Sequence, residues 1–85
     1  MKEFRYVIKD SVGIHARPAG MLVKTAGAFQ SSITVKKGEK TADAKKLFSI
    51  MSLGAKCQDT ILFTIEGSDE QEAADALQKF CEENL

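Results

Sequence analysis

The sequence of 85 residues predicts an α+β protein in which helices cover one face of an antiparallel sheet. Some segments alternate apolar and polar residues with period two, as half-buried strands do, and others repeat apolar residues with helical spacing. These segments follow one another along the chain in the order βαββαβα. Strands with one polar face are typical of an antiparallel sheet that is covered on one side only. Because so short a chain rarely divides, we expect one domain over residues 1–85.

Four segments are expected to form strands. The first is residues 4–8, and the second is residues 33–36, which alternate between apolar and polar side chains. A turn at residues 37–39 and a return at residues 40–43 predict a hairpin. The clearest strand is residues 60–66. The apolar residues expected to share the buried faces are Phe4, Tyr6, Ile8, Ile33, Val35, Ile61, Phe63 and Ile65.

Two further segments predict the first and second helices. Pro18 fits only in the first turn of a helix, so the first helix is expected to begin at about His15 or Ala16. Its buried stripe is expected to contain Ala19, Leu22, Val23, Ala26 and Phe29. Residues 44–53 predict a short helix that Gly54 ends. We expect this helix to place Leu47, Ile50 and Met51 on one side.

The last helix has the clearest start signal. Ser68 followed by Gln71 matches a capping box, in which each side chain bonds a backbone N–H at the helix start. Asp69 and Glu70 would then lie in the first turn, where the helix dipole favours negative charge. The buried stripe is expected to contain Ala73, Ala76, Leu77, Phe80 and Cys81.

The composition excludes several classes of protein. Twelve basic and twelve acidic residues balance, whereas nucleic-acid binders are usually basic. No apolar run reaches the roughly 18 residues of a membrane span. The N-terminal residues lack the apolar stretch of a secretory signal, so we expect a cytoplasmic protein without membrane insertion. Cys57 and Cys81 are far apart and are expected to be free thiols. We expect no metal site.

The single histidine, His15, lies in the segment with the clearest chemical character. At a helix start, free N–H groups and the helix dipole favour an anion such as phosphate. Arg17 matches phosphate geometry, Gly13 permits a tight turn, and Pro18 fixes the first turn beside Ala16. These residues suit an imidazole that accepts and releases a phosphoryl group without a cofactor. The alternative is a surface histidine with a capping role.

The stretch from Gly13 to Pro18, with its His-x-Arg-Pro pattern, resembles the active-site signature of the HPr family. The order of elements, residues 51–54 and the final helix also match this family of phosphocarriers from the sugar phosphotransferase system. The resemblance implies an open-faced β-sandwich with four antiparallel strands and three helices on one face. It implies that His15, at Nδ1, takes a phosphoryl group from enzyme I and passes it to enzyme IIA components, as a carrier rather than a stand-alone enzyme.

The resemblance also implies that the first two helices lie side by side and form a docking face. Lysines would surround an apolar centre and speed the approach of an acidic partner, although lysines on helices are usually only solvated. Phe48 is either exposed on this face or part of the core. The residues expected to contact partners are Gly20, Met21, Lys24, Lys45, Leu47, Phe48 and Met51, with Ala16 beside the site and Lys46 in the basic rim.

One position departs from part of the family. In one branch a regulatory kinase phosphorylates a serine at the start of the second helix, and that position is Lys46 here. Ser49 and Ser52 do not occupy it. Two alternatives to the phosphocarrier stay open, namely a regulatory paralogue and an interaction module without phosphotransfer. We expect a monomer, since a carrier must present one face to several partners.

Overall fold

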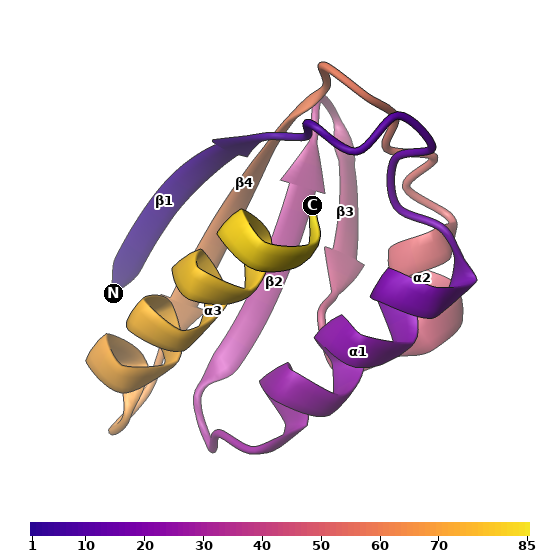
Figure 1. The fold of residues 1–85 in the computed structure, drawn as a ribbon. Helices are drawn as coiled ribbons and strands as arrows, with labels where there is room; N and C mark the ends of the chain where they lie inside the picture. Colours follow the sequence, from indigo (N-terminus) through magenta and orange to yellow (C-terminus); the bar gives the residue numbers. More distant parts are fainter.

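The computed structural model describes all 85 residues and has the predicted order of elements, βαββαβα. Figure 1 shows the helices and strands along the chain. No helix combines the length and the apolar character that crossing a membrane requires. The elements are β1 (Lys2–Val7), α1 (Ala16–Gly27), β2 (Ser32–Lys37), β3 (Lys40–Asp43), α2 (Leu47–Met51), β4 (Thr60–Glu66) and α3 (Glu70–Asn84).

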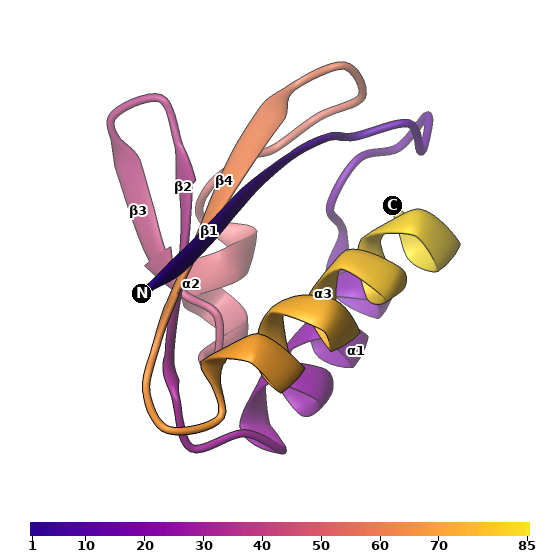
Figure 2. The same ribbon diagram turned by 90° about the vertical axis from the view of Figure 1, so that its left-hand side faces the viewer.

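The four strands form one antiparallel sheet in the order β1-β4-β2-β3. Figure 2 shows the sheet as one layer and all the helices on one face of it, so the predicted open-faced architecture is confirmed. Phe63 of β4 lies opposite Phe4 of β1 and Val35 of β2 in the register. The rings of Phe4 and Phe63 stack with their centroids 4.7 Å apart. The other face of the sheet carries the polar side chains.

The core lies between the sheet and the helices. Alternation in β4 buries Ile61, Phe63 and Ile65 completely, as its period predicts. Each fully buried side chain of this size contributes about 1.5–3 kcal/mol through the hydrophobic effect. Helix α1 packs against both α2 and α3, which places its N-terminal end between them and the loop after β1. The buried residues of α1 and α3 are Pro18, Ala19, Leu22, Ala26, Ala73, Ala74, Leu77, Phe80 and Cys81.

The short helix α2 differs from the prediction. Of the three residues expected on one side, only Ile50 is buried, while Leu47 and Met51 are 36% and 38% exposed. The cause is the length of α2: five residues present a single position to the core, and the rest of the helix faces solvent. The helix ends at Met51 with Ser52 as its C-cap, and the chain then turns through Gly54.

The start of α3 also differs, because no capping box forms at Ser68. Asp69 is the N-cap residue, and the Gly67 N–H donates to Oε1 of Glu70 at 3.2 Å instead. The Asp69 carboxylate accepts the N–H groups of Gln30 and Ser31 at 2.9 Å each, and the Ser31 hydroxyl. These bonds, the hydroxyl first, hold the pKa of Asp69 below its ordinary value. The predicted capping box is absent because α3 begins one residue later than expected, with Asp69 in place of Ser68 at the N-cap position.

Candidate functional site

His15 is the N-cap residue of α1, in extended backbone geometry, as the sequence predicts. Its imidazole makes no capping hydrogen bond. Its two ring nitrogens have no hydrogen-bond partner elsewhere in the protein either, and the side chain is half-buried. His15 therefore occupies the capping position that the alternative expected, but its side chain does not cap the helix. The ring stays available to a ligand or to a partner.

The end of α1 beside His15 offers unpaired donors. The first intrahelical bond runs from the Ala19 N–H to the His15 carbonyl at 2.9 Å, and Pro18 has no N–H. The N–H groups of His15, Ala16 and Arg17 at this end therefore have no partner in the protein. The Arg17 guanidinium is exposed and forms no ion pair. These three N–H groups and the guanidinium suit a small anion such as phosphate.

His15 and Arg17 line a hollow of about 270 Å³ together with residues from the end of α3. Helices α1 and α3 are antiparallel neighbours, and the Leu85 main-chain oxygen accepts the N–H groups of Lys9 and Asp10 at 2.7 Å each. The end of α3 is therefore tied to the loop before His15. The lining residues are Asp10, His15, Arg17, Pro18, Met21, Glu83 and Asn84.

Two carboxylates in this hollow were not expected from the sequence. Asp10 and Glu83 line it with Arg17, and neither was among the expected site residues. The Asp10 carboxylate accepts the Val12 N–H at 2.8 Å and so shapes the loop before the histidine. Glu83 lies 68 residues from His15 in sequence, and only the antiparallel packing of α1 and α3 brings the two together. No local pattern could have signalled this approach.

The loop before His15 is held against residues 55 and 56. The Ile14 N–H donates to the Ala55 carbonyl at 3.0 Å. Gly13 has a φ of +80°, and a Cβ at this position would come within 2.5 Å of the Ala55 oxygen and 2.7 Å of the Lys56 Cα. Glycine is required here both by the left-handed backbone and by the close approach. The tight turn expected at Gly13 is therefore present, with a packing reason that the sequence did not reveal.

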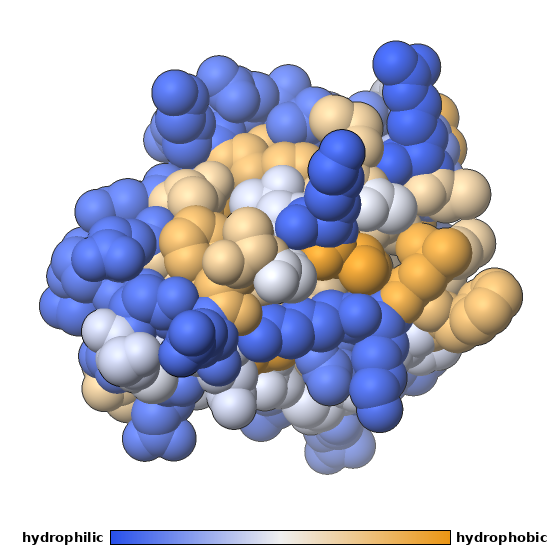
Figure 3. Space-filling view, turned by 90° about the horizontal axis from the view of Figure 1, so that it is seen from below, coloured by the Kyte–Doolittle hydropathy of each residue, from blue (hydrophilic) through white to orange (hydrophobic).

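Apolar side chains are exposed beside this end of α1. Phe48 is 82% exposed, which settles its alternatives in favour of the surface, and Met21 is 42% exposed. With Leu47 and Met51 they form an apolar patch on the adjoining helices α1 and α2. Figure 3 shows apolar side chains gathered on its right-hand side, where α2 lies in Figure 1. Gly20 and Ala16 are exposed on α1.

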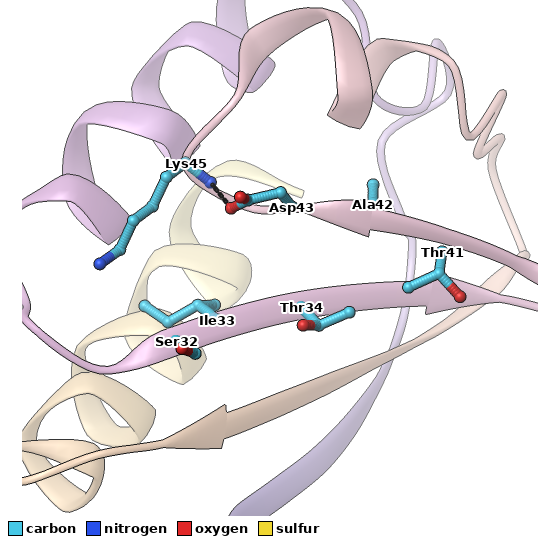
Figure 4. Close-up of a pocket in the computed structure, with 7 residues that line it drawn as sticks. All are labelled: Ser32, Ile33, Thr34, Thr41, Ala42, Asp43 and Lys45. Atoms are coloured by element: carbon cyan, nitrogen blue, oxygen red, sulfur yellow. Dashed lines mark hydrogen bonds between the residues drawn. The ribbon is translucent and has the colours of Figure 1, made fainter.

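The lysines expected around the patch differ in their surroundings. Lys24 and Lys46 are exposed and unpaired, but the Lys45 ammonium donates to the Phe29 carbonyl at 2.8 Å. Because α1 is about 18 Å long, Lys45 lies at the end opposite His15. Figure 4 shows its side chain extending away from Asp43. The hollow drawn there, about 400 Å³, is lined by Ser32, Ile33, Thr34, Thr41, Ala42, Asp43 and Lys45.

The start of α2 carries no phosphorylatable side chain, because Lys46 is its N-cap residue. The neighbouring hydroxyls both have local partners. Ser49 Oγ accepts the Asp43 N–H at 3.0 Å, and Ser52 Oγ donates to the Ser49 carbonyl at 2.7 Å. Neither serine replaces the one that the regulatory branch uses.

The chain matches known proteins over almost its whole length. Residues 2–83 match the family described as PTS HPr component phosphorylation site. Phosphocarrier protein HPr of Mycoplasma genitalium is 41% identical over 85 residues, covering 99% of this chain and 97% of the relative. A crystal structure of HPr from Thermoanaerobacter tengcongensis has a TM-score of 0.92 and 44% identity, covering 96% and 92%. An HPr dimer from the same organism has a TM-score of 0.78 and 43% identity, covering 98% and 95%.

Proposed function

Because the chain belongs to the HPr family of phosphocarriers of the phosphotransferase system, we propose that His15 accepts a phosphoryl group from phosphorylated enzyme I. It then passes the group to enzyme IIA components for sugar uptake. One observation carries this proposal: a hollow that unites an imidazole with free ring nitrogens and a helix end with three unpaired N–H groups. We propose further that the protein acts in the cytoplasm as a monomer.

Each transfer exchanges one bond to phosphorus for another. A ring nitrogen of His15, expected to be Nδ1, forms the N–P bond with its lone pair, and the bond to the donor breaks with its electrons left on the donor. Neutral imidazole is the reactive form, because imidazolium has no free lone pair. The positive end of α1 stabilises the charge on the phosphoryl oxygens.

The donors around His15 match a phosphoryl group. The N–H groups of Ala16 and Arg17 and the Arg17 guanidinium can donate to its oxygens. Asp10 and Glu83 act in the opposite direction, because their negative charge repels that of the phosphoryl group. A group that is attracted from one side and repelled from the other is held less firmly. That balance suits a carrier, which must release what it accepts.

The docking face in this proposal is the apolar patch of Met21, Leu47, Phe48 and Met51. Methionine side chains adapt to differently shaped partners, which suits a surface that meets both enzyme I and enzyme IIA components. The unpaired ammonium groups of the exposed lysines would favour an acidic partner and mainly speed its approach.

The direct test is phosphorylation by enzyme I and phosphoenolpyruvate. The protein should gain the mass of one phosphoryl group, acid should remove it, and His15→Ala should abolish the gain. Arg17→Lys keeps the charge but loses the planar, two-point contact, so transfer should slow by about tenfold. Arg5→Lys is the matched control, since Arg5 is exposed on β1 away from the hollow, and it should transfer at the wild-type rate. Phosphate that persists in His15→Ala would overturn the proposal.

The docking face is tested separately from the chemistry. Phe48→Ala should raise the KM of enzyme I for this protein by about tenfold, as the loss of an aromatic contact at an interface centre does. The value of kcat should change little, because Phe48 is outside the hollow that contains His15. A fall in kcat at unchanged KM would contradict the assignment of this patch.

A further inference from the structure

We propose that Lys37 is a positioning residue for His15, although the two lie on different elements and 22 residues apart in sequence. Lys37 acts through the support loop, which we define as residues 54–59 between α2 and β4. The effect on phosphotransfer rests on the function proposed above, whereas the effect on the loop does not.

The support loop holds the segment that leads to His15 at two places. Near the histidine, the Ile14 N–H donates to the Ala55 carbonyl at 3.0 Å, and Gly13 lies directly against Ala55 and Lys56. At the end of β1, the Ile8 N–H donates to the Asp59 carbonyl at 3.0 Å. The position of His15 therefore follows the position of the support loop.

The support loop has few internal bonds of its own. The Lys56 N–H donates to Asp59 Oδ2 at 2.8 Å, and the Asp59 N–H donates to the Lys56 carbonyl at 3.0 Å. Gln58 has a φ of +77°, a conformation that a residue with a side chain adopts only when its surroundings impose it. Beyond its bonds to residues 8 and 14, among them the Gln58 N–H to the Ile8 carbonyl at 2.8 Å, such a loop also needs an attachment that joins its two ends.

Lys37 supplies that attachment. Its ammonium donates to the Gly54 carbonyl at 3.0 Å and lies 3.2 Å from Asp59 Oδ2, so it joins the first and last residues of the support loop. Lys37 is the last residue of β2, a central strand of the sheet, and is thereby fixed to the core. The bonds from the Lys56 N–H and then from Lys37 keep the pKa of Asp59 below its ordinary value, so the carboxylate stays charged at neutral pH.

Three variants isolate this role. Lys37→Met removes the ammonium and keeps the aliphatic part of the side chain, while Lys37→Arg retains a charged donor. Lys36→Met is the matched control, because Lys36 is the neighbouring residue of β2, is exposed and makes no side-chain hydrogen bond or ion pair. Both methionine variants lose one positive charge, so any effect of charge on encounter with enzyme I is the same in both.

Amide hydrogen exchange of the unphosphorylated protein measures the loop directly. In Lys37→Met the Ile14 and Gln58 amides should exchange about three- to tenfold faster, the change expected when one charged hydrogen bond of a partly exposed pair is lost. The Phe63 amide in the centre of the sheet should keep its rate. The Lys36→Met protein should match the wild type, and Lys37→Arg should restore most of the protection. In one molar salt, the exchange rates of the Ile14 and Gln58 amides should differ less between Lys37→Met and the wild type.

Phosphorylation by enzyme I then measures the consequence for His15. The rate in Lys37→Met should fall by about three- to tenfold at saturating enzyme, with Lys37→Arg close to wild type. Unchanged Ile14 and Gln58 exchange, or an equal acceleration at Phe63, would overturn the inference, because the loop would then not depend on Lys37 specifically. Faster exchange with an unchanged rate would overturn its catalytic part. A wild-type protein that enzyme I does not phosphorylate would instead refute the proposed function.

Discussion

Replacing Gly13 by alanine tests how closely the histidine loop is fitted to the support loop. Two costs follow from the structure. An alanine at a φ of +80° loses about 1–2 kcal/mol of free energy of unfolding to left-handed backbone strain. The added Cβ would also lie 2.5 Å from the Ala55 oxygen and 2.7 Å from the Lys56 Cα. These are backbone atoms that cannot rotate away, and such overpacking costs about 1–3 kcal/mol.

A matched control separates the two costs. Gly38 also has a left-handed backbone, with a φ of +59°, but a Cβ there would meet no atom within 4 Å. Gly38→Ala should therefore lose only about 1 kcal/mol, and Gly13→Ala about 2 kcal/mol more. In a domain of this size the additional loss lowers Tm by about 8–16 °C. Gly20→Ala, in open space within α1, should gain about 0.5–1 kcal/mol.

The assay is thermal unfolding followed by circular dichroism, together with phosphorylation by enzyme I. Gly13→Ala should also be phosphorylated more slowly than Gly38→Ala at a temperature where both are folded, because the histidine loop must shift to admit the methyl group. Equal Tm losses in the two variants would refute the reasoning, since the close contact with the support loop would then carry no energy.

Three further outcomes are expected. The pKa of Asp69 is lowered in the folded protein, so its charged carboxylate stabilises the fold at pH values above the ordinary pKa of about 4. This stabilisation is lost as the pH falls through the lower pKa of the folded protein. In Asp69→Asn the urea midpoint of unfolding should therefore fall less steeply at acid pH than it does in the wild type. Equal pH dependence in the two proteins would contradict a stabilising role for the bonds at this carboxylate. Burial raises the pKa of Cys81 to about 12, so iodoacetamide at about pH 8 should label the half-exposed Cys57 alone in the folded protein. Mass spectrometry that finds both thiols modified at equal rates would contradict this. Phe48→Ala should change the free energy of unfolding by less than about 0.5 kcal/mol, whereas Ile50→Ala, at a fully buried position two residues away, should lose about 2–4 kcal/mol in urea titrations.

Much of the fold could be predicted because the strands have clear local signals. The expected strand at residues 60–66 coincides with β4, and the expected return strand at residues 40–43 coincides with β3. The start of α1 was also predicted, because Pro18 can occupy only the first turn of a helix. Local sequence predicts structure well at positions such as Pro18, where the residue type allows only one place in a helix.

Predictions failed where a side chain had a distant partner or where an element was too short for a pattern. The Asp69 carboxylate bonds residues 30 and 31, and nothing in the local sequence of α3 indicates this. Helix α2 has five residues, too few for spacing to distinguish Ile50 from its exposed neighbours. In the candidate site, His15 and Arg17 were found from their own motif. Glu83 was not, because only packing between elements brings it to the hollow, and the contact of Lys37 with the support loop likewise joins distant parts of the chain.

The hollow around His15 is open on one side, and the end of α1 and its neighbours provide no lid. A phosphoryl group carried there would be in contact with water throughout its journey between proteins, so hydrolysis would compete with delivery. Its lifetime sets the time in which the carrier must meet a recipient. Exclusion of water would then fall to a partner surface that covers the hollow during the transfer. The water-free surroundings of the transfer would therefore be formed jointly by this protein and its partner.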